Sequence, residues 1–360
     1  MMSPKETVQF RNELTDWFDA HHRKLPWRDT QNPYRIWVSE VMLQQTQVTK
    51  VLHYYQDFLD KFPDVQCLAQ ANLQDVLKAW EGLGYYARAR NLHQAAKVIV
   101  SDFGGKIPAD YAIFRNLPGV GDYIAAAVQS IAFHAPYAVV DGNVKRVVAR
   151  LFLINSPINA SSSSKTFQNM ADMLLDRDSP GAFNQAMMEL GATVCRPKSP
   201  LCVICPVKSV CCAFQSVRQE EFPIRLKPKP LPEFRLAVGV VRKNNRVLIT
   251  QRKFDGLLGG MWEFPGDEIK GQETPEEACI RQVKEHVNLT VEVTEYLTRV
   301  KHAFTHFKIV ADVFCCRYQS GEVALNGPVD HRWITVDEID QFPFPRAHHQ
   351  IIPSVKGNSA

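Results

Sequence analysis

The chain has 360 residues with 45% hydrophobic and 10% aromatic content, which is enough apolar material for two globular cores and a connecting segment. Its formal net charge of +4 is only mildly basic, so a nucleic-acid partner has to be argued from local clusters of Lys and Arg. No apolar run approaches the roughly 20 residues of a membrane span, and the first residues lack the apolar centre of a secretory signal. We therefore expect a cytoplasmic protein with no membrane partner.

Basic side chains gather at residues 21–24, 88–90, 145–150 and 196–198, all in the first two-thirds of the chain. Each cluster is either a phosphate contact or a solvated helix face. Residues 5 to about 212 are predicted to be helical, because apolar residues recur at intervals of three and four and are interrupted by Pro and Gly. This region is therefore predicted to form an all-α domain.

One predicted helix covers residues 37–47 and places positions 40, 44 and 47 on one face. A glutamate in a helix is usually solvated. Glu40, however, has Trp, Val, Met and Leu as neighbours, which predicts a partly buried carboxyl group with a raised pKa. Such a group is suited to donating a proton near neutral pH.

The run Leu-Pro-Gly-Val-Gly at residues 117–121 lies between two predicted helices. Gly119 and Gly121 leave the backbone N–H groups free to approach a phosphate, although an ordinary interhelical turn explains the run equally well. Some twenty residues later, Asp141 stands at a turn just before another helix. Capping of that helix is the simple explanation for an aspartate at this position.

Four of the nine cysteines, Cys195, Cys202, Cys205 and Cys211, have the spacing C-x6-C-x2-C-x5-C. Four thiolates in one short loop can bind either zinc or an iron–sulfur cluster. Zinc usually uses two separated C-x2-C pairs, and this loop has one. The remaining five cysteines are interpreted as core or surface thiols.

A proline-rich segment at residues 213–234 is predicted to be a stiff, extended linker. After it, residues 235–360 are predicted to form an α+β domain. Two β-rich runs flank Lys243-Asn-Asn245 as a hairpin, Thr274 caps an amphipathic helix, and two more strands lie near residues 289–300 and 307–318.

Together these segments resemble the MutY-type adenine DNA glycosylases of the endonuclease III superfamily. The likeness covers most of residues 5–212 and includes the hairpin at 117–121 and the following Asp141. It implies that residues 1–212 form a helix-hairpin-helix glycosylase domain. Because the cysteine spacing resembles that of endonuclease III, it also favours a [4Fe–4S] cluster over zinc in the loop at 195–211.

The resemblance implies catalytic roles for particular residues. The run at 37–48 resembles the segment in which a glutamate protonates adenine, which implies that Glu40 is the general acid. Asp141, supported by Asn143, is then implied to stabilise the oxocarbenium-like sugar, either electrostatically or through a transient covalent adduct. Tyr123 stands where related lyases carry a catalytic lysine, which implies a monofunctional enzyme that uses water. Lys145 is interpreted as a bystander.

The likeness also implies the residues that bind the substrate. Trp27, Arg28 and Glu189 are expected to line a pocket for the flipped adenine, and Gln44 and Tyr85 are expected to wedge into the base stack. Taken singly, each of these residues is better explained by core packing or by an exposed polar face, and the interpretation rests on their joint occurrence in order.

Residues 263–286 resemble a degenerate Nudix box. The motif ends in Arg281-Gln-Val-Lys-Glu285-His286, which lacks two of the acidic positions that hold divalent metal ions, so hydrolysis of nucleotides is not expected. Phe304, Thr305 and His306 resemble the Phe-Ser-His motif with which the family contacts 8-oxoguanine. The alternative is that Phe304 and Thr305 are ordinary residues of a β-strand.

The resemblance therefore implies a monomeric base excision repair enzyme. It would bind double-stranded DNA, flip out adenine paired with 8-oxoguanine or guanine, and hydrolyse its N-glycosidic bond. Three alternatives remain. A lyase acting on oxidised pyrimidines needs a hairpin lysine, which Tyr123 replaces. A non-catalytic iron–sulfur module does not explain Glu40 together with Asp141. A Nudix hydrolase needs the missing acidic residues.

Overall fold

The computed structural model describes residues 2–357, which divide into two compact units. Unit 1 comprises the residues up to Ala69 together with Gln94–Pro228. Unit 2 comprises Gln70–His93 together with the residues from Lys229 onward. This division differs from the predicted domains 1–212 and 235–360, because a stretch of helical sequence belongs to the second unit.

The described residues before Glu233 are helical and contain no strand, as the periodicity predicts. The α-helices of this region are α1 (Pro4–His21), α2 (Pro33–Leu43), α3 (Val48–Lys61), α4 (Val65–Gln70), α5 (Leu73–Ala79), α6 (Ala87–Phe103), α7 (Tyr111–Arg115), α8 (Asp122–Phe133), α9 (Gly142–Phe152), α10 (Ser164–Leu174), α11 (Pro180–Thr193) and α12 (Cys212–Gln215). Three short 3-10 helices, η1 (Ser161–Ser163), η2 (Cys202–Ile204) and η3 (Lys208–Val210), complete it.

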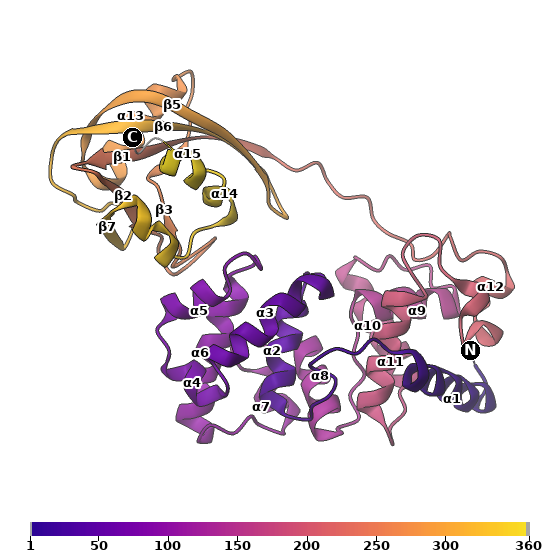
Figure 1. Cartoon of the computed structure of the whole chain (residues 1–360). Helices are drawn as coiled ribbons and strands as arrows, with labels where there is room; N and C mark the ends of the chain where they lie inside the picture. The colour runs from indigo at the N-terminus through magenta and orange to yellow at the C-terminus, as the bar shows by residue number, and fades with distance from the viewer. Residues whose placement is uncertain (1, 358–360) are drawn as a thin grey trace. The chain divides into compact units, whose positions relative to one another are not determined.

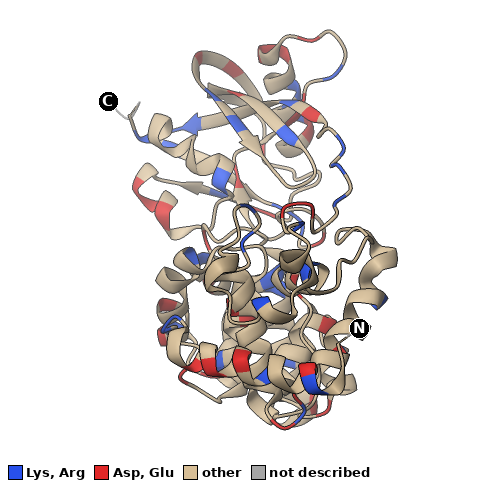
Figure 2. Cartoon of the chain, turned by 90° about the vertical axis from the view of Figure 1, so that its right-hand side faces the viewer, with Lys and Arg blue, Asp and Glu red and all other residues tan. Residues whose placement is uncertain are grey.

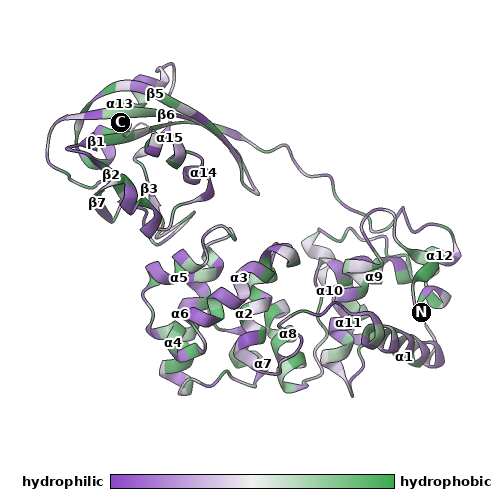
Figure 3. Cartoon of the chain, in the orientation of Figure 1, coloured by the Kyte–Doolittle hydropathy of each residue, from purple (hydrophilic) through white to green (hydrophobic). Residues whose placement is uncertain are grey.

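Helices α2 and α8 pack against each other at the centre of unit 1 (Figure 1). Both are strongly apolar, and α8 is hydrophobic over most of its length (Figure 3). The Asn32 side chain accepts hydrogen bonds from the backbone of the first turn of α2, which fixes where this helix begins. Eight residues of α2 are buried, including Glu40.

The predicted helix over residues 37–47 is wrong at its C-terminal end. Helix α2 stops at Leu43, because Gln44 leaves the helical region and Gln45 takes a left-handed φ of 56°. Gln47 is already the N-cap of α3. Positions 40, 44 and 47 therefore do not share one helix face. Local periodicity cannot reveal such a break, because it continues across the turn.

Unit 2 is built on a seven-stranded sheet with the order β3-β2-β1-β6-β5, in which β4 pairs with β1 and β7 pairs with β2. β1 and β6 are parallel and the other pairs are antiparallel. The predicted hairpin is confirmed, since Asn244 and Asn245 both have the positive φ of a tight turn. The strands are β1 (Glu233–Lys243), β2 (Arg246–Gln251), β3 (Trp262–Glu263), β4 (Gly266–Glu268), β5 (Thr290–Ala303), β6 (Lys308–Ser320) and β7 (Asp330–Ile334).

Each face of this sheet buries its own core. Helix α13 (Pro275–Val287), capped by Thr274 as predicted, packs on the face that carries Ala237 and Val241. The opposite face carries Val238 and Val240, and η4 (Val336–Gln341), α14 (Arg346–His349) and α15 (Ile352–Gly357) contribute to its core. The alternation along β1 is that expected for a central strand covered on both faces.

Residues 216–232 connect α12 to β1 without helix or strand. Helix α12 and the first residues of β1 shorten the predicted linker, 213–234, at both ends. Basic side chains recur along this connection, including Arg218, Arg225, Lys227 and Lys229 (Figure 2). Within residues 2–357, no helix is both long enough and apolar enough to cross a membrane.

Candidate active site

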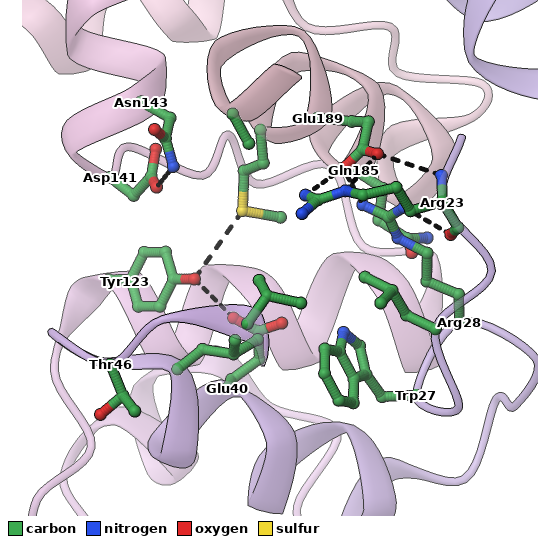
Figure 4. A pocket seen from close by; sticks show the side chains of 15 residues that line it. Arg23, Trp27, Arg28, Glu40, Thr46, Tyr123, Asp141, Asn143, Gln185 and Glu189 are labelled. Atoms are coloured by element: carbon green, nitrogen blue, oxygen red, sulfur yellow. Dashed lines mark hydrogen bonds and ion pairs between the residues drawn. The ribbon is translucent and has the colours of Figure 1, made fainter. Parts of the chain in front are cut away.

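A cavity of about 150 Å³ lies within unit 1, and most of the catalytic and pocket residues predicted from the sequence line it (Figure 4). Side chains from α2, α8, α9, α11 and the segment before α2 converge on it. The residues around the cavity are Arg23, Leu25, Trp27, Arg28, Glu40, Leu43, Thr46, Val48, Tyr123, Asp141, Asn143, Gln185, Met188, Glu189 and Ala192.

Glu40 projects into this cavity from the buried face of α2 and is 4% exposed. Burial raises the pKa of its carboxyl group to about 7, although the hydrogen bond from Tyr123 opposes the shift. The charge of Asp141 raises this pKa further and that of Arg28 lowers it. Near neutral pH a large share of Glu40 is therefore protonated, as a general acid requires.

The Tyr123 hydroxyl lies between Glu40 and α11 (Figure 4). It donates to Glu40 Oε2 at 2.5 Å and also lies 3.7 Å from the sulfur of Met188. Burial and the neighbouring carboxylates raise the pKa of Tyr123 well above its usual value, so the phenol keeps its hydrogen. It can therefore act here as a hydrogen-bond donor.

Asp141 is the N-cap of α9, and its carboxylate accepts hydrogen bonds from Val144 N at 2.7 Å and from Asn143 Nδ2 at 2.8 Å. Burial raises the pKa of Asp141, while these hydrogen bonds and the charge of Arg146 favour the ionised form. The capping explanation is thus correct, and the same carboxylate also lines the cavity.

Close packing of α9 on α11 supports this arrangement. A Cβ atom at Gly191 of α11 would lie 2.6 Å from the Cβ atom of Asn143. A side chain at this position would therefore displace Asn143. Asn143 is held in turn by Arg146, whose Nη2 donates to its Oδ1 at 2.9 Å.

Glu189 lies at the other side of the cavity and is 1% exposed. It accepts hydrogen bonds from the backbone and guanidinium of Arg23 and from Arg28 Nη2 at 2.8 Å. Burial alone would raise the pKa of Glu189, but these hydrogen bonds lower it to about 2. Glu189 is therefore an acceptor at neutral pH, in contrast to Glu40.

Trp27 is buried beside this ion-pair network, where its ring meets Tyr55 edge to face with centroids 5.3 Å apart. The wall of the cavity thus combines an aromatic ring with fixed hydrogen-bonding groups. Such a combination suits a flat heterocyclic base.

The predicted hairpin is formed by α7, the turn at 117–121 and α8. Gly119 has a φ of 74°, which favours glycine, and Gly121 is the N-cap of α8. Both glycines are exposed, and Arg115 forms an ion pair with Asp122 beside them. The exposed backbone N–H groups at this helix start are available to a phosphate.

Two predicted wedge residues lie outside the cavity lining. Gln44 stands at the end of α2, and Tyr85 belongs to unit 2, where it has a left-handed φ of 51° and is 44% exposed. Within that unit the Tyr85 hydroxyl lies 2.6 Å from Thr305 Oγ1. This contact joins the predicted wedge residue Tyr85 to Thr305 of the predicted 8-oxoguanine motif.

Phe304, Thr305 and His306 lie in the turn between β5 and β6. The alternative that Phe304 and Thr305 are ordinary β-strand residues is therefore wrong. Phe304 stacks on Phe307 with ring centroids 4.7 Å apart. Thr305 and His306 are exposed. The C-terminal part of the degenerate Nudix box lies on α13, where Arg281 is paired with Glu285 and with Glu273 from the segment before the helix.

The four clustered cysteines line a small cavity of about 20 Å³ around the end of Arg150. Arg150 Nη1 donates to Cys195 Sγ at 3.3 Å. Burial raises the pKa of Cys205 to about 12 and that of Cys211 to about 11, with contributions from neighbouring cysteines. The four thiols thus face one space, and a cationic donor there suits a ligand set of thiolates. In the described part of the chain, no three His, Cys, Asp or Glu residues are grouped to hold a single metal ion.

Sequence reasoning missed several residues of the active-site cavity. Arg23 belongs to a basic cluster interpreted as a phosphate contact or a solvated face, yet it pairs with Glu189. Gln185 lies about one helical turn before Glu189 on α11, and this spacing was the signal that could have indicated it. Met188 directly precedes Glu189, and its spacing gives no such signal. No local pattern indicated Thr46 or Val48.

Comparison with known proteins agrees with this architecture. Residues 38–172 match the HhH-GPD superfamily of base excision DNA repair proteins, and residues 237–354 match the NUDIX domain. A thermostable thymine-DNA glycosylase of known structure is 29% identical and superposes with a TM-score of 0.55, over 59% of this chain and 98% of its own. Endonuclease III, trapped covalently on DNA, shares the fold at 22% identity, with a TM-score of 0.52 over 60% of this chain and 99% of its own. The protein is a DNA glycosylase of base excision repair with a Nudix-like C-terminal region.

Curated relatives narrow this class. Human adenine DNA glycosylase is 35% identical over 92% of this chain and 71% of its own length. The adenine DNA glycosylase of Buchnera aphidicola from Acyrthosiphon pisum is 29% identical over 97% of this chain and 98% of its own. The chain belongs to the adenine DNA glycosylase family.

Proposed function

We propose that the protein removes adenine from duplex DNA when the adenine is paired with 8-oxoguanine or guanine. The observation that carries this proposal is the convergence of Glu40, Tyr123 and Asp141 on one cavity (Figure 4). Burial raises the pKa of Glu40 to about 7, so this carboxyl group is partly protonated near neutral pH. Burial also raises the pKa of Asp141, but hydrogen bonds from Val144 and Asn143 favour its anion. Two carboxyl groups in contrasting environments can serve as a proton donor and as an anionic stabiliser.

In this proposal the N-glycosidic bond between adenine and its sugar is hydrolysed in two stages. Glu40 donates its proton to a ring nitrogen of adenine, which makes the base a better leaving group. The bond between base and sugar then breaks, and the sugar develops positive charge that Asp141 stabilises, either electrostatically or as a transient covalent adduct. Asn143 holds the Asp141 carboxylate toward the sugar. Water supplies the hydroxyl group of the abasic product, and the proton that this water releases replaces the one that Glu40 gave to adenine.

The base has to leave the DNA stack to reach an enclosed pocket. Trp27, Arg28 and Glu189 are proposed to hold the flipped adenine, and Gln44 and Tyr85 are proposed to fill the gap beside it. The exposed N–H groups at Gly119 and Gly121 are proposed to bind the DNA backbone. This binding positions the duplex without reading its sequence.

We propose that the reaction stops at the abasic site. Tyr123 places a phenol, and no amine, at the hairpin position used by lyases, and its hydroxyl is engaged by Glu40. The nearest candidate amine on α9, Lys145, lies over the ring of Phe167 and within 3.5 Å of Ile158 O. These contacts support its interpretation as a bystander.

We propose that Cys195, Cys202, Cys205 and Cys211 hold a [4Fe–4S] cluster, because the four side chains line one small cavity and Arg150 donates a hydrogen bond to Cys195 there. Such a group would fold the loop and so present Arg196, Lys198 and Lys208 to DNA phosphates. We further propose that the turn at Phe304, Thr305 and His306 reads 8-oxoguanine.

The test uses end-labelled duplexes with adenine opposite 8-oxoguanine, guanine, cytosine or thymine. We expect excision opposite 8-oxoguanine and guanine, with strand breaks appearing after alkali treatment. Glu40→Gln and Asp141→Asn should each bind the duplex but lose about 10²-fold or more in excision rate. Glu276→Gln, at an exposed position on α13, is the matched control and should be unchanged. Stoichiometric nicking without alkali, or full activity of Glu40→Gln, would overturn the proposal.

A further inference from the structure

The hydroxyl group of Tyr123 has two acceptors and one hydrogen. Glu40 Oε2 lies 2.5 Å from its oxygen, and the sulfur of Met188 lies 3.7 Å from it (Figure 4). A thioether sulfur accepts hydrogen bonds and cannot donate them. The phenol can therefore direct its hydrogen to the carboxyl group or to the sulfur, but not fully to both.

The protonation state of Glu40 decides between these acceptors. When Glu40 is ionised, it can only accept, so Tyr123 donates to it. When Glu40 is protonated, its own hydrogen can be donated to the Tyr123 oxygen. The phenol hydrogen is then free to turn to the sulfur of Met188, which lies 3.7 Å from the Tyr123 oxygen. The sulfur thus offers a partner to the hydroxyl in the protonated state.

We propose that Met188 is a positioning residue that favours the protonated form of Glu40, by accepting the Tyr123 hydrogen when the carboxyl group carries its own. This inference rests on the proposed role of Glu40 as the general acid. The position is well defined, because Met188 packs against two apolar clusters, which include Met187 and Leu190 from α11 and Ala126 and Val139 from the α8 side.

Other charged and titratable groups around Glu40 act on it by different routes. They are Tyr123 from α8, Asp141 at the start of α9, Arg28 from the segment before α2, and Glu189 from α11, which is paired with Arg23 and Arg28. Helix α3 contributes the apolar Val48 to the cavity. Met188 carries no charge and does not titrate, so its effect on Glu40 passes through the Tyr123 hydroxyl.

The test compares Met188→Leu with Met187→Leu, a matched change at the neighbouring core position. Leucine keeps the apolar volume but removes the acceptor. The Glu40 titration is followed in the DNA-free protein by difference infrared spectroscopy of the protonated carboxyl C=O stretch, identified by its loss in Glu40→Gln. Met188→Leu should move the midpoint to lower pH by about 0.5 pH. Met187→Leu should leave it in place.

The same comparison is made in a Tyr123→Phe background, where the hydroxyl is absent. There, Met188→Leu should cause no further shift. An equal shift in both backgrounds, or no shift in either, would overturn the role of Met188. The infrared readout does not depend on excision, so this result can be separated from the proposed function. Excision rates measured against pH should show the same displacement of the alkaline limb if Glu40 is the acid.

Discussion

At the residue scale, the cavity holds two glutamates whose surroundings drive them in opposite directions. Glu189 receives two guanidinium groups and is held ionised. Glu40 is buried, feels the opposite charge only of Arg28, forms no ion pair among the described residues, and is held partly protonated. A sequence can indicate burial of Glu40 from its apolar neighbours. It cannot indicate that Arg23 and Arg28 reach Glu189, because they are far apart in the chain and meet only through the packing of α11.

Glu40→Gln should make the folded protein more stable at alkaline pH while abolishing excision. The pKa of Glu40 is raised on folding from 4.5 to about 7, so this carboxyl group lowers the free energy of unfolding progressively as the pH rises through that range. The penalty is complete above the folded pKa and absent below the unfolded pKa. The gain should be of order 1–3 kcal/mol at pH 8 and close to zero at pH 4. Thermal unfolding of both proteins across this pH range provides the measurement. A loss of stability at pH 8 would instead indicate a structural carboxylate.

At the scale of elements, catalytic geometry depends on how closely α9 and α11 approach each other. The Gly191→Ala variant should lower the excision rate by an order of magnitude or more, because its added methyl group overlaps Asn143 and so disturbs Asp141. The matched change Gly142→Ala, where a Cβ meets no atom within 4 Å, should have a far smaller effect. Single-turnover rates with both variants check this expectation. Equal rates for Gly191→Ala and the parent protein would contradict it.

The cysteine loop is a second element, and its geometry depends on four cysteine side chains that line one cavity. Purified protein should be brown, with an absorbance band at about 410 nm, as is expected of four-cysteine [4Fe–4S] proteins. Cys202→Ser should reduce both this absorbance and duplex binding, because the fold of the loop is coupled to its ligand. Cys67→Ser, at an exposed cysteine outside the loop, is the control and should alter neither. Colourless protein with stoichiometric zinc would contradict the cluster.

Elements with a strong local signal were predicted well, and their ends were predicted less well. The helix N-cap at Thr274 and the hairpin at Asn244-Asn245 follow from local chemistry and are confirmed. The break after Leu43 is not marked by Pro or Gly, so periodicity alone carried the predicted helix too far. Lining residues such as Met188 depend on tertiary packing, which no local pattern encodes.

At the scale of the whole molecule, the proposed acid Glu40 and the proposed stabiliser Asp141 belong to unit 1, whereas the proposed reader of 8-oxoguanine belongs to unit 2. Thr305→Val should therefore reduce the preference for 8-oxoguanine over guanine several-fold, while excision opposite guanine changes little. It removes a hydroxyl group at nearly constant volume, and buried or directed hydroxyl contacts contribute about 1 kcal/mol. Thr290→Val, at an exposed position on β5, is the control. The ratio of rates on the two duplexes is the measurement, and an unchanged ratio would contradict this division of labour.

The parallel pairing of β1 with β6 has a consequence for the order in which unit 2 assembles. The hairpins β1–β2 and β5–β6 join strands that are neighbours in the chain, so little loop-closure entropy opposes them. β1 and β6 are separated in the chain by β2, β3, β4, α13 and β5, and their register, which begins at Glu233 and Lys308, spans ten residue pairs. Such non-local contacts form late in folding. Amide hydrogens of β5 and β6 should therefore gain protection during refolding before those that link β1 to β6.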